Sequence, residues 1–420
     1  MQIKNIRLWA IPIIAVLFIS LTCREPGDKS ADNSNKGDTE IAGHILNLPP
    51  MKNNFKNYFE LGNIFNPRDI SDGKINNERL TRHYNVLTAE NNMKPSYLSP
   101  EQGIYNFQIA DDMVNAALVS GFKVVGHTLL WHSQLPVWQR NLRADSTSRE
   151  TALDMMKTYI TGVVSHFKGR VYKWDVLNEA FPDGGFSFDW KTSMRNDPQN
   201  GNPWFIKIGS DFVYEGFLAA RLADPAATLY YNDYNLNHNS FNLETLSKTT
   251  LVRDMVRDVN QRYAEELPAI KASNPNINLT RTNKLIEGIG LQSHHNTTVT
   301  PDSVRKSIEI FRPLGVELSI SELDVLGQSY QNFESIGQGT NKHGQTTVTP
   351  EGLETQARLY GEYFTIFLEN SDIISRVTFW GVSDNESWRS AALPQLFDPE
   401  NNAKSAYFKV IEALEAYSAK

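Results

Sequence analysis

Two apolar segments of the chain each lead into a glutamate. In WDVLNEA (residues 174–180), Asn178 and Glu179 follow a run of Trp, Val and Leu, and in VELSISELDV (residues 316–325) Glu322 occupies a similar position. Hydrolysis of a glycosidic bond requires an acid that protonates the leaving oxygen and a second carboxylate that acts as nucleophile or base. Glu179 and Glu322 therefore predict this chemistry. The alternative is that both glutamates form ion pairs at the ends of strands.

Polar residues near the two glutamates fit the same reaction. Asn178 precedes Glu179 directly and is suited to hydrogen-bond a sugar hydroxyl. His294 ends another apolar segment and could bridge Glu322 and Asp324, and a histidine in that position would keep the nucleophile ionised and oriented. Taken singly, His294 is equally compatible with a structural role.

The segment GHTLLWHSQLP (residues 126–136) places His127, Trp131, His132 and Gln134 close together. Two histidines five residues apart invite a metal site, but zinc requires three or four close ligands and the other polar groups here are neutral. We therefore expect no metal and no cofactor.

Two further groups are candidates for binding. Glu90, Asn91 and Lys94 follow one apolar segment and offer donors and acceptors for several hydroxyls, or else Glu90 and Lys94 form an ion pair at the rim. Trp380 and Trp388 flank the polar run SDNES, which favours a loop that presents flat platforms to sugar rings over two tryptophans in the core.

These residues must be positioned by a repeated alternation of strands and helices. Short apolar segments occur at residues 59–65, 84–92, 123–131, 172–180, 227–235, 286–295, 316–325 and 376–382. Most are followed by a longer segment with helical spacing, so the chain is predicted to be α/β, a single (β/α)8 TIM barrel with extended βα loops at 181–208 and 326–352. The alternative, an open doubly wound sheet, would show a Gly-rich phosphate turn after the first strand. The active site of a barrel lies at the carboxyl ends of its strands.

Composition limits the ligand. The chain of 420 residues has a formal net charge of -7 and no long basic run, so nucleic acid is not an expected partner. Eight Trp and sixteen Tyr provide many amphipathic faces for an uncharged ligand, although most of them are also compatible with the core.

The N-terminus predicts export. Lys4 and Arg7 precede an apolar run that ends at residue 22, and Cys23 is the one cysteine of the chain. We predict a lipoprotein-type signal peptide at 1–22, lipidation of Cys23, a flexible polar tether at 23–48 and the barrel at 49–420. An ordinary cleaved signal and an uncleaved anchor are the alternatives. A single cysteine rules out an intramolecular disulfide.

Taken together, HTLLWHSQLP, WDVLNEA, YYNDYN, GIGLQSHH, ISELDV and TFWGVSDNESW resemble glycoside hydrolase family 10, the retaining endo-β-1,4-xylanases. The resemblance covers roughly residues 50 to 417. It implies that Glu179 is the general acid/base, that Glu322 is the nucleophile supported by His294 and Asp324, and that Asn178 binds the 2-hydroxyl.

The resemblance also implies the binding residues. The sugar on the non-reducing side of the cleaved bond would contact Lys94, His127, Gln292 and Trp380. Glu90, Asn91, Trp131, Gln134 and Trp388 would serve that sugar or the next one, and Tyr234 the leaving-group side. The expected partners are xylan and xylo-oligosaccharides, the expected membrane contact is a lipid anchor alone, and the chain is expected to be monomeric. A β-1,4-glucanase and a non-catalytic xylan-binding lipoprotein are the competing functions.

Overall fold

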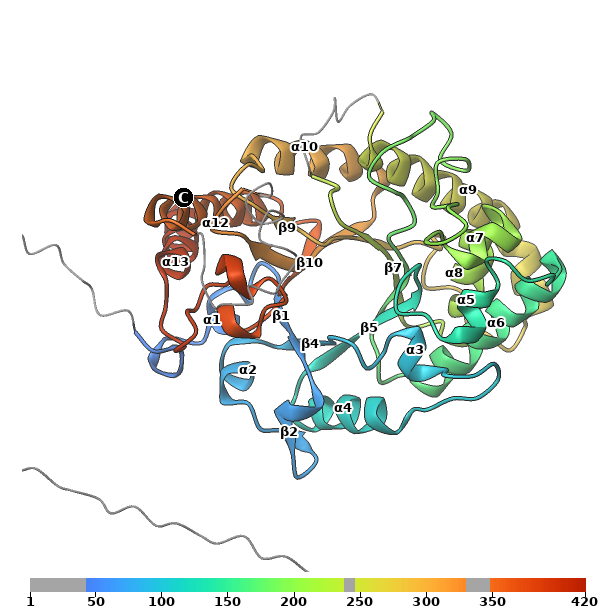
Figure 1. The fold of residues 1–420 in the computed structure, drawn as a ribbon, viewed down its shortest axis with the longest axis horizontal. Coiled ribbons are helices and arrows are strands. Elements are labelled where there is room, and N and C mark those ends of the chain that lie inside the picture. The colour runs from blue at the N-terminus through green and yellow to red at the C-terminus, as the bar shows by residue number, and fades with distance from the viewer. Residues whose placement is uncertain (1–42, 238–245, 330–347) are drawn as a thin grey trace, which may run out of the picture. The chain divides into compact units, whose positions relative to one another are not determined.

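Eight parallel strands close into a barrel in the computed structural model, which describes residues 43–237, 246–329 and 348–420. Neighbouring strands pair in the order β11, β1, β4, β5, β6, β7, β8 and β10, and the pairing of β10 with β11 completes the ring. Figure 1 looks into this ring, with the longer helices arranged around its outside. The predicted (β/α)8 barrel is confirmed.

Seven of the eight predicted strand segments contain one barrel strand each, and the eighth, 376–382, overlaps β11, which begins two residues earlier at Ile374. The barrel strands are β1 (Glu60–Phe65), β4 (Val86–Ala89), β5 (Lys123–Leu130), β6 (Lys173–Asn178), β7 (Thr228–Asp233), β8 (Gly288–Leu291), β10 (Glu317–Val325) and β11 (Ile374–Phe379). The predicted segment 286–295 divides into β8 and the short β9 (His294–His295), which pairs with β10 beside Asp324. A small ladder of β2 (Ile70–Ser71) and β3 (Lys74–Ile75) lies outside the barrel sheet.

The helices follow the strands as the alternation predicts. They are α1 (Met51–Asn54), α2 (Glu78–His83), α3 (Pro95–Leu98), α4 (Gln108–Val119), α5 (Val137–Asn141), α6 (Arg149–His166), α7 (Pro203–Ile208), α8 (Asp211–Ala223), α9 (Lys248–Ser273), α10 (Pro301–Phe311), α12 (Pro350–Glu369) and α13 (Ser405–Ser418). Within the described ranges, none of the helices is long and apolar enough to span a membrane.

Close packing between the barrel and its surrounding helices depends on small residues next to large ones. All six residues of β6 are buried, and the ring of Trp174 lies against Gly126 of β5. A Cβ atom at Gly126 would lie 2.2 Å from that ring, so only glycine allows Trp174 to pack between β5 and Phe167 at the end of α6. This packing fixes the strand that carries Asn178 and leads into Glu179.

The start of the folded part differs from the prediction, which placed residues 44 to 48 in the tether. The short 3-10 helix η1 (Ile45–Asn47) precedes α1, and Ile45 is fully buried. His44 pairs with Asn402 in a β-bridge. The apolar side chain of Ile45 and this backbone pairing attach the segment to the barrel, so residues 44–48 belong to the folded part. The predicted signal peptide, Cys23 and residues 330–347 of the predicted loop 326–352 lie outside the described residues.

Candidate active site

The carboxyl ends of the barrel strands surround a cavity of about 860 Å³. The predicted residues that line it are Glu90, Asn91, Lys94, His127, Trp131, Gln134, Asn178, Glu179, Tyr234, Gln292, His294, Glu322, Trp380 and Trp388. Asp324 is fully buried and meets the site through His294. The structure thus brings these side chains together, while their individual roles stay predictions.

Glu322 is buried in β10 and is held by two donors. Asn232 Nδ2 donates to Oε1 at 2.8 Å, and His294 Nε2 donates to Oε2 at 3.2 Å. Burial raises the pKa of this carboxyl, but the hydrogen bonds from His294 and Asn232 and the charges of the nearby histidines outweigh burial and lower the pKa to about 2. Glu322 is therefore ionised at neutral pH, as a nucleophile must be.

His294 bridges Glu322 and Asp324, as predicted. Its Nδ1 donates to Asp324 Oδ2 at 2.9 Å. Burial lowers the pKa of His294, but the charge of Asp324 and the hydrogen bonds to Asp324 and Glu322 raise it to about 9. Asp324 also accepts hydrogen bonds from Trp388 Nε1 and Arg389 Nη1, each at 3.2 Å. The imidazolium is thus fixed between two carboxylates.

Asn232, which was not predicted as a site residue, connects the surroundings of the two glutamates. Its Nδ2 donates to Asn178 Oδ1 at 2.9 Å as well as to Glu322. Ser321 Oγ donates to its Oδ1 at 2.6 Å, and a Cβ atom at Gly290 would lie 2.1 Å from the same oxygen. The site therefore requires glycine at position 290 to leave room for Asn232.

Glu179 lies directly beyond β6 with a φ of 55°, in the left-handed region that non-glycine residues seldom adopt. Trp131 Nε1 donates to Oε2 at 2.8 Å, and Gln292 Nε2 donates to Oε1 at 3.0 Å. His132 Nδ1 lies 3.8 Å from Oε2. Burial lowers the pKa of His132 to about 4, so a neutral imidazole stands beside Glu179 at neutral pH.

The residues after β4 form a hydrogen-bonded group at one side of the cavity. Lys94 Nζ donates to Asn91 Oδ1 at 3.2 Å and lies 5.0 Å from the ring centroid of Trp131. Glu90 Oε2 accepts from Asn66 Nδ2 at 2.8 Å. In the described residues Glu90 and Lys94 thus bond to other partners and not to each other, so the alternative of an ion pair between them is wrong. Burial lowers the pKa of Lys94, which faces the cavity beside three glutamates.

The two C-terminal tryptophans differ in exposure. Trp380 is 6% exposed and packs edge-on against His127, with ring centroids 5.5 Å apart. Trp388 is 46% exposed and covers His294 at 5.2 Å. Both line the cavity, and Trp388 presents the larger free face to a ligand.

The orientation of His127 is fixed by Asp175, which was not predicted as a site residue. Asp175 Oδ2 accepts from His127 Nδ1 at 3.0 Å, and both side chains are buried. Residues 43–237, 246–329 and 348–420 contain no cluster of three or more His, Cys, Asp or Glu that could hold a metal ion. His127 and His132 contact different carboxylates, Asp175 and Glu179.

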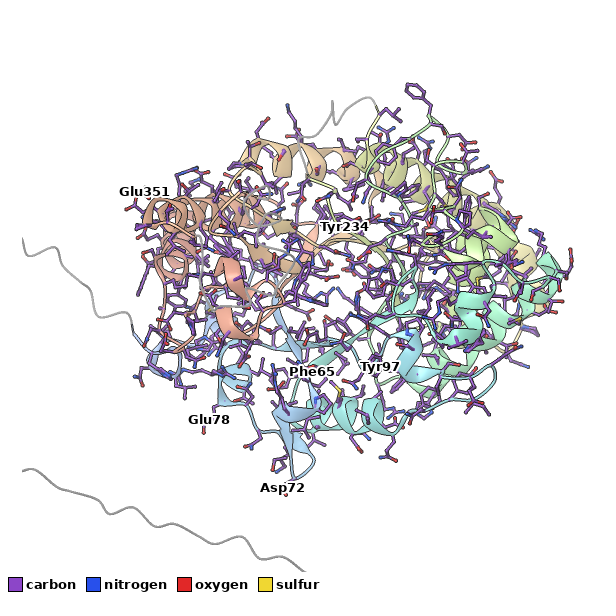
Figure 2. The ribbon with its side chains drawn as sticks, viewed as in Figure 1. Phe65, Asp72, Glu78, Tyr97, Tyr234 and Glu351 are labelled. Carbon is purple, nitrogen blue, oxygen red and sulfur yellow. The ribbon has the colours of Figure 1, made fainter. Side chains whose placement is uncertain are left out.

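The β6–α7 loop, residues 179–202, also contributes to the lining of the cavity. Asp183 of this loop lines the cavity together with Tyr234 and Asn235. Figure 2 labels Tyr234 toward the middle of the ring, whereas Glu351 and Glu78 lie at its outside. Arg195 donates a hydrogen bond to Tyr234, and Lys248 donates one to Asp183. None of the three charged residues was predicted, because they lie in a loop and at a helix start.

Comparison with known proteins agrees with this arrangement. The model for glycosyl hydrolase family 10 matches residues 50–413. A curated endo-1,4-beta-xylanase from Geobacillus stearothermophilus is 35% identical over 373 residues, which is 87% of this chain and 98% of that protein. The exoglucanase XynX of Acetivibrio thermocellus is 34% identical, but the alignment spans 88% of this chain and only 30% of that protein.

Solved structures give the same result. A family 10 xylanase with a bacterial Ig-like domain from termite gut is 49% identical with a TM-score of 0.80, and the match covers 90% of this chain and 80% of that one. A mutant of the xylanase TsXylA from Thermoanaerobacterium saccharolyticum, in complex with xylotriose, is 32% identical with a TM-score of 0.67 and covers 87% and 98%. With a family model that matches most of its length and relatives above 30% identity, this chain belongs to glycosyl hydrolase family 10.

Proposed function

We propose that this protein is an endo-1,4-β-xylanase that hydrolyses internal bonds of xylan with retention of configuration. The observation that carries the proposal is the pair of glutamates in one cavity with different surroundings. Glu322 is held ionised by His294 and Asn232. Glu179 is held by the neutral donors of Trp131 and Gln292.

These surroundings support separate roles for the two carboxyl groups. Glu322 attacks the anomeric carbon, and Glu179 gives its proton to the departing sugar oxygen, which leaves a covalent glycosyl-enzyme. Glu179 then removes a proton from water, which attacks the same carbon and releases Glu322. Asn178, whose Oδ1 accepts from Asn232 and Gln292, faces the cavity and is placed to bind the 2-hydroxyl.

Both the side chains that line the cavity and the named relatives favour xylan as the substrate. The cavity combines three tryptophans with amide, hydroxyl and charged side chains, a lining typical of neutral sugars. Named relatives of similar length are xylanases, and one solved relative binds xylotriose. Measuring new reducing ends from xylan and from soluble cellulose derivatives, with residues 44–420, tests this choice.

Glu322→Ala is the decisive variant for the mechanism. We expect it to abolish turnover of xylan while xylo-oligosaccharides still bind, because the groove keeps its other side chains. If the variant keeps a near-normal rate, the assignment of the nucleophile is wrong. If the unchanged protein binds xylan without releasing reducing ends, the non-catalytic binding function replaces the proposal.

A β-1,4-glucanase is the second candidate function, because one relative is named exoglucanase XynX. Glucan differs from xylan by a hydroxymethyl group on each ring, so subsite walls alone decide between the two. A kcat/KM for cello-oligosaccharides that equals or exceeds the value for xylo-oligosaccharides of the same length would favour this candidate.

We further propose export, lipidation at Cys23 and a monomeric barrel on a polar tether. The order of Lys4, Arg7, the apolar run and Cys23 supports the first two points. Metabolic labelling with an alkyne fatty acid should mark the full chain and not Cys23→Ala. Sedimentation of residues 44–420 should give the mass of one chain.

A further inference from the structure

Arg195, in the middle of the β6–α7 loop, contacts both Glu179 and Tyr234. Its Nε donates to the backbone oxygen of Glu179 at 2.9 Å, and its Nη2 donates to Tyr234 Oη at 2.7 Å. Its backbone N–H donates to Ala180 O at 2.9 Å. One planar guanidinium therefore joins the predicted acid/base to the side chain predicted to face the leaving group.

Tyr234 is fixed in turn from its other side. Its hydroxyl donates to Asp183 Oδ2 at 2.7 Å. Lys248 Nζ donates to Asp183 Oδ1 at 2.9 Å and to Asp233 Oδ1 at 3.3 Å, and it lies 3.8 Å from the ring centroid of Tyr234. The side chain of Lys248 is 4% exposed. Arg195 is thus the last member of a continuous chain of contacts from Lys248 to Glu179.

The backbone of Glu179 needs such a contact. With a φ of 55°, Glu179 has a conformation that is unfavourable for a residue with a Cβ atom. Its N–H donates to Asn232 O at 2.9 Å, and its carbonyl oxygen accepts from Arg195. The peptide groups on both sides of Glu179 are therefore held, which fixes the direction of the carboxyl group.

We propose that Arg195 is a positioning residue that couples the acid/base Glu179 to the leaving-group side of the cavity through Tyr234 and Asp183. A sugar bound against Tyr234 or Asp183 then strengthens the hydrogen bond from Arg195 to the backbone oxygen of Glu179, and this bond orients the carboxyl group that donates the proton. This inference rests on the proposed function. It differs from a role in folding alone, because it concerns the proton transfer to the departing oxygen.

The test compares two leaving groups on the same sugar. In phenyl β-xylobioside the leaving oxygen needs a proton, whereas in 2,4-dinitrophenyl β-xylobioside it departs without one. Misplacing a catalytic group by about 1 Å costs on the order of 100-fold, and acid catalysis contributes about 100-fold or more. For Arg195→Ala we expect kcat/KM to fall about 10- to 100-fold with the phenyl substrate and less than about threefold with the dinitrophenyl substrate.

Further variants and a chemical rescue separate positioning from structure. Added guanidinium should restore part of the activity of Arg195→Ala toward the phenyl substrate. Arg195→Lys should stay impaired, because a single ammonium group cannot donate to both Glu179 and Tyr234 as the guanidinium does. Trp190 anchors the same loop outside the lining of the cavity, through a hydrogen bond from its Nε1 to Asp258 Oδ2 at 2.9 Å. Trp190→Phe should change kcat/KM for the two substrates in equal proportion. A double-mutant cycle of Arg195→Ala with Tyr234→Phe should be non-additive for the phenyl substrate.

The outcomes are distinct. If Arg195→Ala lowers kcat/KM equally for both substrates, or if Trp190→Phe also discriminates between them, Arg195 only anchors the loop and the inference is overturned. If the effects of Arg195→Ala and Tyr234→Phe multiply, the coupling is overturned. If the unchanged protein cleaves neither xylobioside, the proposed function fails and the inference fails with it. Thermal melting of each variant shows whether a lost rate reflects lost folding.

Discussion

Replacing His294 with asparagine should shift the acid limb of the pH profile of kcat/KM to higher pH. His294 supplies one of the two hydrogen bonds that Glu322 accepts, together with a positive charge. In His294→Asn the carboxyl group stays buried, and burial favours the protonated form. A protonated Glu322 cannot act as a nucleophile, so the rate falls where this pKa is crossed.

The size of the effect follows from the pKa of Glu322, which lies at about 2 and not at its ordinary 4.5. At 1.36 kcal/mol per pKa unit, this difference favours the carboxylate by about 3 kcal/mol. Asn232 still donates to Glu322 in the variant, so part of this preference remains. We therefore expect the pKa to rise by about one to two units, from the loss of one charged donor.

The assay is the hydrolysis of xylotetraose at low substrate concentration, from about pH 2 to pH 7, since kcat/KM reports the groups of the free enzyme. His295→Asn is the matched control, because His295 is the other residue of β9 and its ring packs against Tyr363 with centroids 4.9 Å apart. The control should keep the acid limb of the unchanged protein. An acid limb that stays in place in a well-folded, active His294→Asn would refute the idea that His294 sets the ionisation of Glu322.

Further predictions follow from the same contacts. The pKa of His294 lies at about 9, above its ordinary 6.5, so its contribution to stability is complete below about pH 6.5 and is lost as the pH rises through 9. The free energy of unfolding in urea, measured at a series of pH values, should show this decline, and the decline should be smaller in His294→Asn. Gly126→Ala should lower the free energy of unfolding by about 1–3 kcal/mol or more in urea titrations, because its Cβ would lie 2.2 Å from Trp174. Proton NMR of the first product should show the β-anomer, as a retaining enzyme requires.

The barrel could be predicted because each strand end carries its own signal. A run such as WDVLNEA changes from apolar to polar at the point where the strand meets the active-site face, so Glu179 identifies both a strand and its direction. The same holds for Glu322 and His294. By contrast, the predicted tether extended to residue 48, because the apolar residues Ile45, Leu46 and Leu48 form too short a run to show a helical or strand period, although Ile45 is buried.

Asn232 and Asp175 were missed although both lie in predicted strands. In each case a polar residue is buried within a strand, where unpaired polar groups are costly, so its presence indicates a partner. Identifying that partner requires the register between strands. The pairing of Asn178 with Asn232 across β6 and β7 places the two amides side by side, and sequence order does not specify this alignment.

Arg195 and Lys248 show a different limit. Arg195 lies in a loop without periodicity, so its distance from Glu179 cannot be inferred from spacing. Lys248 begins α9, where the helix dipole disfavours a cation, and a lysine there indicates a nearby carboxylate. That signal predicts an acidic partner such as Asp183 or Asp233 without naming which one. The φ of 55° at Glu179 has no counterpart in local sequence preference, since glycine or asparagine would be favoured. Local preference is thus broken at the residue that must donate the proton, and the contacts that hold it there come from distant loops and strands.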